Sequence, residues 1–150
     1  MPVTAPDQAA TIRRFYEECL NQCHSGILTE LFTPDAVVHA PNGDAVGIPA
    51  IEKTLEGVHA MFPDHHFVID DIIVSGDKAA ARWTMTSTHT APIAGIPPTG
   101  RALTQRAIVF YRFAEDRIDE VWLQLDQVGI LRQIGVPIPG GPPQNSNPKN

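Results

Sequence analysis

Lysine is scarce in this sequence, and acidic side chains outnumber basic ones. Only three lysines, Lys53, Lys78 and Lys149, occur among 150 residues, and the formal net charge is −6. Nucleic acids and anionic membranes bind basic surfaces, so we expect neither as a partner. None of these lysines interrupts an apolar strand, where desolvation favours the neutral amine that imine chemistry needs. The sequence therefore gives no support to a Schiff-base enzyme.

Long hydrophobic runs and cysteines are also few. No apolar run approaches the ~20 residues of a membrane-spanning helix, and the first ten residues do not resemble a signal peptide. The two cysteines, Cys19 and Cys23, lie four residues apart in one expected helix. Their Cβ atoms would be about 5–6 Å apart, which is too far for an easy disulfide. Free thiols are typical of the reducing cytoplasm, so we expect a cytoplasmic protein.

Common catalytic and metal-binding motifs are missing from the sequence. It contains no Gly-x-Ser-x-Gly elbow, no His-Glu-x-x-His, no His-x-His and no Cys-x-x-Cys. We predict no cofactor and no metal, although a metal site assembled from distant strands stays open. Of the six histidines, His24 and His59 are expected at the surface, and His65 and His66 on opposite faces of a strand.

Hydrophobic spacing divides the chain into a helical first half and a second half of strands. The first half predicts helices at 11–23, 26–32 and 48–61 and a short strand at 36–40. The second half predicts strands at 65–74, 78–90, 101–113 and 118–125, a long loop at 91–100, and a short closing helix at 126–134. This order indicates an α+β fold, in which three N-terminal helices and a curved, cone-shaped antiparallel sheet enclose an apolar pocket. We assign residues 1–135 to this domain and 136–150 to a Pro-, Gly- and Asn-rich tail that is disordered or laid on the surface.

The two hairpins predict which side chains share a face. If Val74 opposes Lys78, then Asp70 opposes Arg82. If Phe113 opposes Ile118, one face of the second hairpin carries Gln105, Ala107, Val109, Tyr111, Glu120, Trp122, Gln124 and Asp126. The opposite face carries Ile108, Phe110, Val121, Leu123 and Leu125. Both faces are apolar in the middle and no helix remains to cover the second, so we expect a homodimer built sheet against sheet.

Several short motifs occur in a characteristic order. They are Phe62-Pro63-Asp64, Gly76-Asp77, Arg82-Trp83, Thr88-His89-Thr90, the loop 95–100, Arg117-Ile118-Asp119-Glu120, Trp122 with Asp126, and the segment 129–135. The chain resembles the SnoaL-like polyketide cyclases, also known as predicted ester cyclases, over residues 11–135. That family belongs to the superfamily of cone-shaped folds that includes ketosteroid isomerase and nuclear transport factor.

The resemblance implies an intramolecular aldol condensation that needs neither metal nor cofactor, with a small apolar carbonyl compound as the ligand. The family's acid/base is an aspartate near the end of the last strand, a position that Asp126 matches. The sequence departs from the commoner pattern at Ala107 and Val109, where relatives often carry polar or acidic side chains, and in its Pro-rich tail.

Asp126 and His39 are the catalytic candidates. Burial beside Trp122 would favour a protonated Asp126 and so make the carboxylate a better base. Alternatively, Asp126 caps the helix that follows it. His39 would hydrogen-bond a substrate carbonyl or act as the partner acid, and a buried histidine satisfied by the backbone is the alternative.

The expected substrate-binding residues share an aromatic, sulfur-containing or amide character that suits a flat polycyclic ligand. They are Trp122, Trp83, Tyr16, Met61, His89, Gln105 and Gln124. Core packing is the alternative for the apolar members. Three functions follow: a cyclase or isomerase that abstracts a C–H proton, a hydrolase or dehydratase in which Asp126 activates water, and a binding or accessory module without catalysis.

Overall fold

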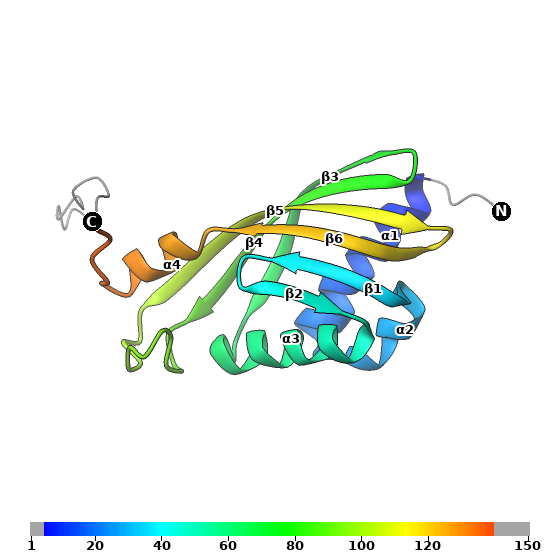
Figure 1. The fold of residues 1–150 in the computed structure, drawn as a ribbon. Helices are drawn as coiled ribbons and strands as arrows, with labels where there is room; N and C mark the ends of the chain where they lie inside the picture. Colours follow the sequence, from blue (N-terminus) through cyan, green and yellow to red (C-terminus); the bar gives the residue numbers. More distant parts are fainter. Residues whose placement is uncertain (1–4, 140–150) are drawn as a thin grey trace.

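A curved six-stranded sheet with helices on one side forms the body of the protein (Figure 1). The computed structural model describes residues 5–139. The strand order is β2-β1-β6-β5-β4-β3, and the sheet is not closed into a barrel. The strands are β1 (Phe32–Ala40), β2 (Gly43–Val46), β3 (His66–Ser75), β4 (Lys78–Thr88), β5 (Ala102–Ala114) and β6 (Arg117–Leu125). The α+β prediction is confirmed.

The sheet is mixed, which differs from the predicted antiparallel sheet. Strand β1 runs parallel to β6, and every other neighbouring pair is antiparallel. The sequence pattern did not reveal this pair, because β1 and β6 lie almost eighty residues apart along the chain. Strand β2 was also missed: Gly43 and Asp44 read as turn residues, yet both belong to the strand that pairs with β1.

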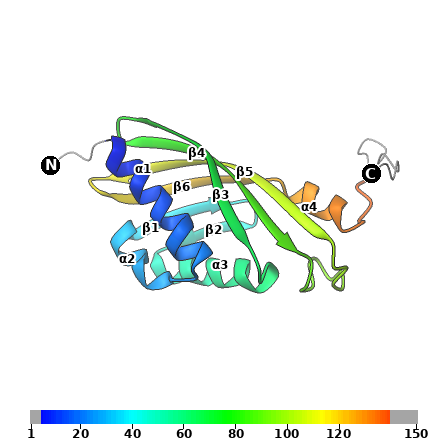
Figure 2. The same ribbon diagram turned by 180° about the vertical axis from the view of Figure 1, so that it is seen from behind.

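The helices cover one face of the sheet, which we call the inner face (Figure 2). They are α1 (Ala5–Arg14), the π-helical segment η1 (Phe15–Asn21), the 3₁₀ turn η2 (Ser25–Ile27), α2 (Leu28–Leu31) and α3 (Ile48–Met61). The predicted helix 11–23 thus corresponds to α1 and η1 together. At the end of η1, the Asn21 amide pairs with Phe67 through bonds of 2.7 and 2.9 Å. This contact satisfies backbone groups of the edge strand β3.

A single-residue bulge exchanges the two faces of the second hairpin. Phe113 pairs with Ile118 as predicted, but Arg112 pairs with Glu120, so Asp119 is an extra residue in β6. Because side chains alternate along a strand, one added residue moves every following side chain to the other face. Asp119 accepts hydrogen bonds from Arg112 (2.7 Å) and Thr33 (3.1 Å), which fix the bulge in place.

The first hairpin contains a similar bulge in β3. Ile69 pairs with Trp83, but Asp71 pairs with Arg82, which leaves Asp70 as the extra residue. The predicted Asp70–Arg82 pair is therefore wrong: Asp70 instead accepts a hydrogen bond from Thr84 at 2.6 Å.

The core lies between the inner face and the helices. From β4 and β5 it contains Ala79, Ala81, Trp83, Met85, Leu103, Ala107, Val109, Tyr111 and Phe113. The other face, which we call the outer face, exposes large apolar side chains, among them Ile73 (67%), Phe110 (53%) and Trp122 (38%).

The last described helix is α4 (Gln127–Gln133), which packs against β5 beyond the end of β6 (Figure 1). Most of the predicted tail, residues 140–150, lies outside the described residues. None of the described helices has the length and apolar character needed to cross a membrane.

Candidate functional site

Three buried aromatic side chains form a polar network on the inner face. The Oη atom of Tyr16, from η1, lies 2.6 Å from the Oη atom of Tyr111 on β5. The indole Nε1–H of Trp83, from β4, donates to the same Tyr16 oxygen at 2.9 Å. All three side chains are almost fully buried. These hydrogen bonds place the chain's two tyrosines side by side, although they lie far apart in the sequence.

This network contains one more donor proton than it contains hydrogen bonds. Trp83 N–H, Tyr16 O–H and Tyr111 O–H supply three protons, but only two hydrogen bonds join the groups. Whichever tyrosine donates to the other, one phenolic proton has no acceptor among the described residues. A buried donor without a partner is costly, so an oxygen of a ligand or a water is the expected acceptor.

Burial keeps both phenols protonated. Desolvation raises the pKa of Tyr16 to about 12, against the opposing effect of hydrogen bonds with Tyr111 and Trp83. Desolvation and the neighbouring Tyr16 raise the pKa of Tyr111 well above its ordinary value. At neutral pH the pair is therefore a hydrogen-bond donor and not a base.

His89 supplies a second donor of this kind. The Thr99 backbone N–H donates to Nδ1 at 3.2 Å, and the Thr99 hydroxyl lies 2.8 Å from the same nitrogen. Since Nδ1 accepts a hydrogen bond, the imidazole is neutral and its proton is on Nε2. The side chain of His89 is fully buried, and Nε2 has no hydrogen-bond partner among the described residues.

Gln105 lies between these donors along the inner face. It pairs with Met85 in the neighbouring strand and is buried, and its amide makes no hydrogen bond with the described residues. On β6, the inner-face residues Leu123 and Leu125 are only partly buried. The predicted inward positions of Trp83, Tyr16, His89 and Gln105 agree with the structure, but their role in binding stays a prediction.

Asp126 is the N-cap of α4, as one of the two sequence interpretations proposed. Its Oδ1 atom accepts a hydrogen bond from Gly129 N at 2.8 Å. The carboxylate lies so close to Gly129 that a Cβ there would be 2.2 Å from Oδ2. The expected burial of Asp126 beside Trp122 is wrong: the Asp126 side chain is exposed. Its catalytic role stays a prediction.

Trp122 and Gln124 lie on the outer face, contrary to the expectation that they line the pocket with Gln105. The bulge at Asp119 explains the error, because it turns them away from Tyr111, which pairs with Val121. Both side chains are exposed. Met61, at the end of α3, is exposed as well.

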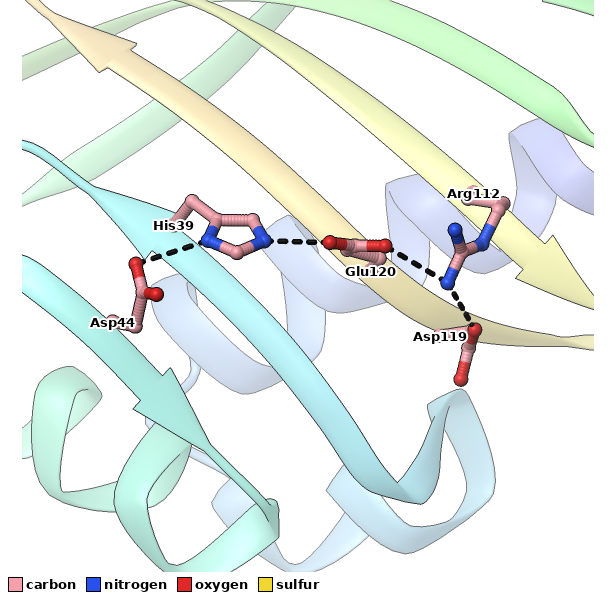
Figure 3. A network of polar contacts seen from close by, with 5 residues as sticks. All are labelled: His39, Asp44, Arg112, Asp119 and Glu120. Atoms are coloured by element: carbon pink, nitrogen blue, oxygen red, sulfur yellow. Dashed lines mark hydrogen bonds and ion pairs between the residues drawn. The ribbon is translucent and has the colours of Figure 1, made fainter.

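His39 also lies on the outer face, where both of its ring nitrogens meet carboxylates (Figure 3). Nδ1 is 2.9 Å from Asp44 and Nε2 is 2.6 Å from Glu120. These hydrogen bonds, the one to Glu120 first, raise the pKa of His39. Glu120 also pairs with Arg112 at 2.8 Å. Neither nitrogen of His39 is available to a substrate in this arrangement, and the alternative of a buried histidine satisfied by the backbone is also wrong.

Sequence reasoning did not select Tyr111 as a site residue. The signal was present: a tyrosine inside an apolar strand needs a partner for its hydroxyl. The predicted register, however, placed Tyr111 with Trp122 and Asp126 and concealed its proximity to Tyr16.

The curved sheet and its helical cover define the cone-shaped α+β fold of the nuclear-transport-factor-like superfamily. A protein-family model described as SnoaL-like polyketide cyclase matches residues 10–134, and the chain belongs to this family. Among proteins with curated descriptions, none matches significantly.

Solved structures of similar proteins agree with this assignment. Wild-type IdmH from Streptomyces antibioticus, assigned as a polyketide cyclase, is 31% identical, with a TM-score of 0.77 over 86% of this chain and 99% of its own. TsrD from Streptomyces laurentii is 24% identical, with a TM-score of 0.80 over 90% of this chain and 99% of its own. AclR from Streptomyces galilaeus, assigned as a hydroxylase, is 24% identical, with a TM-score of 0.77 over 88% of this chain and 98% of its own. The last two show the fold alone, and the fold does not determine the reaction.

Proposed function

We propose that this protein is a cyclase or isomerase of a polyketide-like or polycyclic carbonyl compound, and that the inner face holds the carbonyl oxygen. The observation that carries the proposal is the set of buried donors without acceptors: one phenolic proton of the Tyr16–Tyr111 pair and the Nε2–H of His89. Carbonyl oxygens are the acceptors that these donors lack. Because Trp83 and His89 lie six residues apart along extended chain, roughly 20 Å, the tyrosine pair and His89 would meet different oxygens of one ligand. As one of these oxygens becomes an enolate, its growing charge strengthens its hydrogen bond and lowers the barrier.

We assign the proton abstraction to Asp126, on the family resemblance and on its place directly after Leu125 at the end of β6. Oδ1 is used by the helix cap, and Oδ2 has no hydrogen bond with the described residues. In the proposed step, Oδ2 removes a proton from carbon beside a carbonyl, and the C–H electrons form the enolate. The enolate carbon bonds to a second carbonyl carbon of the same molecule. The resulting alkoxide takes up the proton, so the step needs no other reactant.

Binding by the donors can be tested with naphthols as enolate mimics. We expect the wild-type protein to bind 2-naphthol, and the double variant Tyr16→Phe/Tyr111→Phe, which has neither phenolic proton, to weaken binding by about fivefold, the equivalent of one net hydrogen bond of about 1 kcal/mol. Lys53→Ala, an exposed change on α3, is the control and should bind normally. Equal binding by the wild type and the double variant would remove the basis of the proposal.

Proton abstraction can be tested in D₂O with a 1,3-diketone as the probe. We expect the protein to accelerate deuterium uptake at the carbon between the carbonyls, and Asp126→Asn to abolish the acceleration while naphthol binding persists. Exchange that survives in Asp126→Asn would exclude this residue as the base.

A non-catalytic binding module is the second candidate, because Asp126 is exposed and already engaged as a helix cap. Naphthol binding without any wild-type exchange would favour it. The hydrolase or dehydratase alternative predicts incorporation of ¹⁸O from labelled water into a product, which ring closure does not.

We also propose that the outer face pairs with a second copy of the chain. An apolar row crosses the sheet from Trp122 through Phe110 and Ala80 to Ile73, in register on four neighbouring strands. Large apolar patches of this kind are unusual on monomers. We expect light scattering to give a dimer mass for the wild type and a monomer mass for Phe110→Glu. Met61→Glu, an exposed change far from this row in sequence, should remain dimeric.

The two free cysteines are consistent with the cytoplasm, which we retain as the proposed location.

A further inference from the structure

Three metal-ligating side chains converge where the helical cover meets the start of β3. Cys23 follows η1, His59 lies on α3, and His65 directly precedes β3. One potential ligand atom from each residue lies within 4.8 Å of the other two. The sequence does not predict this cluster, because the residues fit no short metal-binding motif.

The spacing agrees with tetrahedral coordination of zinc. With Zn–S near 2.3 Å and Zn–N near 2.0–2.1 Å, tetrahedral geometry separates a sulfur and a nitrogen ligand by about 3.5 Å. The Sγ atom of Cys23 lies 3.5 Å from Nδ1 of His59. These two ligands are therefore already at the distance that a shared ion requires.

His65 is oriented as a metal-ligating histidine usually is. Its Nδ1–H donates to the carbonyl of Phe62 at 2.8 Å. A backbone carbonyl on one ring nitrogen commonly holds the other nitrogen toward a metal. The second nitrogen, Nε2, lies 2.7 Å from the Leu20 carbonyl. The Sγ atom of Cys23 lies 3.6 Å from the same carbonyl oxygen, so Nε2 is on the side of His65 that faces Cys23.

Releasing Nε2 from Leu20 would leave no carbonyl without a partner. The Leu20 oxygen also accepts from the backbone N–H of Cys23 at 3.3 Å, and the Phe62 oxygen accepts from the backbone N–H of His65 at 3.0 Å. A neutral His65 could therefore keep Nδ1–H on Phe62 and turn the Nε2 lone pair to an ion.

Cys23 adopts a left-handed backbone conformation, with φ of 53°, which is uncommon for a residue other than glycine. Such conformations are often found at functional sites. Cys23 and His59 are exposed and His65 is buried. An ion held here would have protein ligands on its inner side and solvent on the other.

We propose that Cys23, His59 and His65 bind one divalent transition-metal ion of the zinc class, with the fourth coordination position open to water. Cysteine and histidine are the ligands such ions prefer. On binding, the Cys23 thiol loses its proton to solvent as the S–metal bond forms. The ion would join the turn after η1, the C-terminal half of α3 and the start of β3. It would thereby hold the helical cover on the inner face, separately from the donors of Tyr16 and His89.

Cobalt(II) is the probe, because a thiolate ligand gives it a charge-transfer absorption and tetrahedral geometry gives it strong visible bands. We expect untagged, reduced protein to bind one Co²⁺ with both features and to release it to Zn²⁺. Cys23→Ser should lose the charge-transfer band. His59→Ala should weaken binding by at least the ~10–100-fold that loss of a ligand-orienting partner costs.

His24→Ala and Cys19→Ala are the matched controls, since His24 adjoins Cys23 outside the cluster and Cys19 is the chain's other thiol. Both should retain the wild-type spectrum. Zinc should raise the melting temperature of the wild type but not that of Cys23→Ser, because an ion that binds only the folded state stabilises it. A wild type without the charge-transfer band, or a band that persists in Cys23→Ser, would overturn the proposal.

Discussion

The proton count on the inner face predicts unequal costs for removing the two tyrosine hydroxyls. Tyr16→Phe removes the oxygen that joins Trp83 and Tyr111, so both hydrogen bonds are lost. The Trp83 N–H and the Tyr111 O–H are then both buried without partners. Tyr111→Phe removes only the bond between the phenols, and Trp83 keeps its acceptor. The number of donors without acceptors rises from one to two in Tyr16→Phe and stays at one in Tyr111→Phe.

The magnitudes follow from general values for buried polar groups. A hydrogen bond contributes about 1 kcal/mol net, and a buried group left without its partner costs about 1–3 kcal/mol. Tyr111→Phe, which loses one hydrogen bond, should therefore lower the free energy of unfolding by about 1 kcal/mol. Tyr16→Phe, which loses two hydrogen bonds and leaves one more donor unpaired, should lower it by about 3–5 kcal/mol. The ring volumes barely change, so packing contributes little to the difference.

Urea unfolding at pH 7, followed by tryptophan fluorescence and circular dichroism, measures both values without a ligand. Unchanged m-values would show that the two variants unfold from comparable states. Equal losses for the two variants, or a larger loss for Tyr111→Phe, would refute the proton count and with it the argument for a donor that awaits a ligand.

Three further predictions concern single groups. Because the pKa of His39 is raised in the folded protein, protonation of His39 stabilises the fold fully below about pH 6.5, its ordinary pKa. This contribution is lost as the pH rises through the folded-state pKa. NMR titration should show that the pKa of His39 falls in Glu120→Gln. The pKa of Asp64 is lowered to about 2, chiefly because the Ser87 hydroxyl donates a hydrogen bond to its carboxylate. Asp64 therefore contributes its full stabilisation above the ordinary pKa of ~3.9, and this contribution is lost as the pH falls toward about 2. In acid unfolding, Asp64→Asn should reduce the change of stability with pH over that range. Asp126→Ala should remove the acceptor of the Gly129 N–H and cost about 1 kcal/mol in thermal unfolding, the value of a helix cap, whereas an unchanged stability would show that the cap contributes nothing.

The local features of this fold could be predicted from the sequence. Apolar spacing located α3, both hairpins and the closing helix to within a few residues, and Asp126 was correctly identified as a possible cap. Each of these depends on neighbours only a few positions away, where spacing and turn chemistry act directly.

The faces of β6 and of part of β3 could not be predicted, because each depends on a single bulged residue whose effect extends along the rest of the strand. Asp119 and Asp70 read as ordinary polar strand positions, and their bulges appear only when tertiary partners such as Arg112 and Thr33 are in place. The cluster of Cys23, His59 and His65 was hidden for a related reason: no spacing rule connects segments that only the fold brings together.

The bulge at Asp119 has an implication for how this chain can change. Hydrophobicity alone does not choose between the two sides of the second hairpin, since Phe110 and Ile108 could fill an interior as readily as Val109 and Tyr111. Deleting the one residue at 119 would turn Trp122 and Gln124 toward the inner face and Leu123 and Leu125 toward the outer face. With the ligand on the inner face and a second copy on the outer face, as proposed, one codon would control both substrate choice and self-association, and an insertion or deletion in this hairpin would change both together.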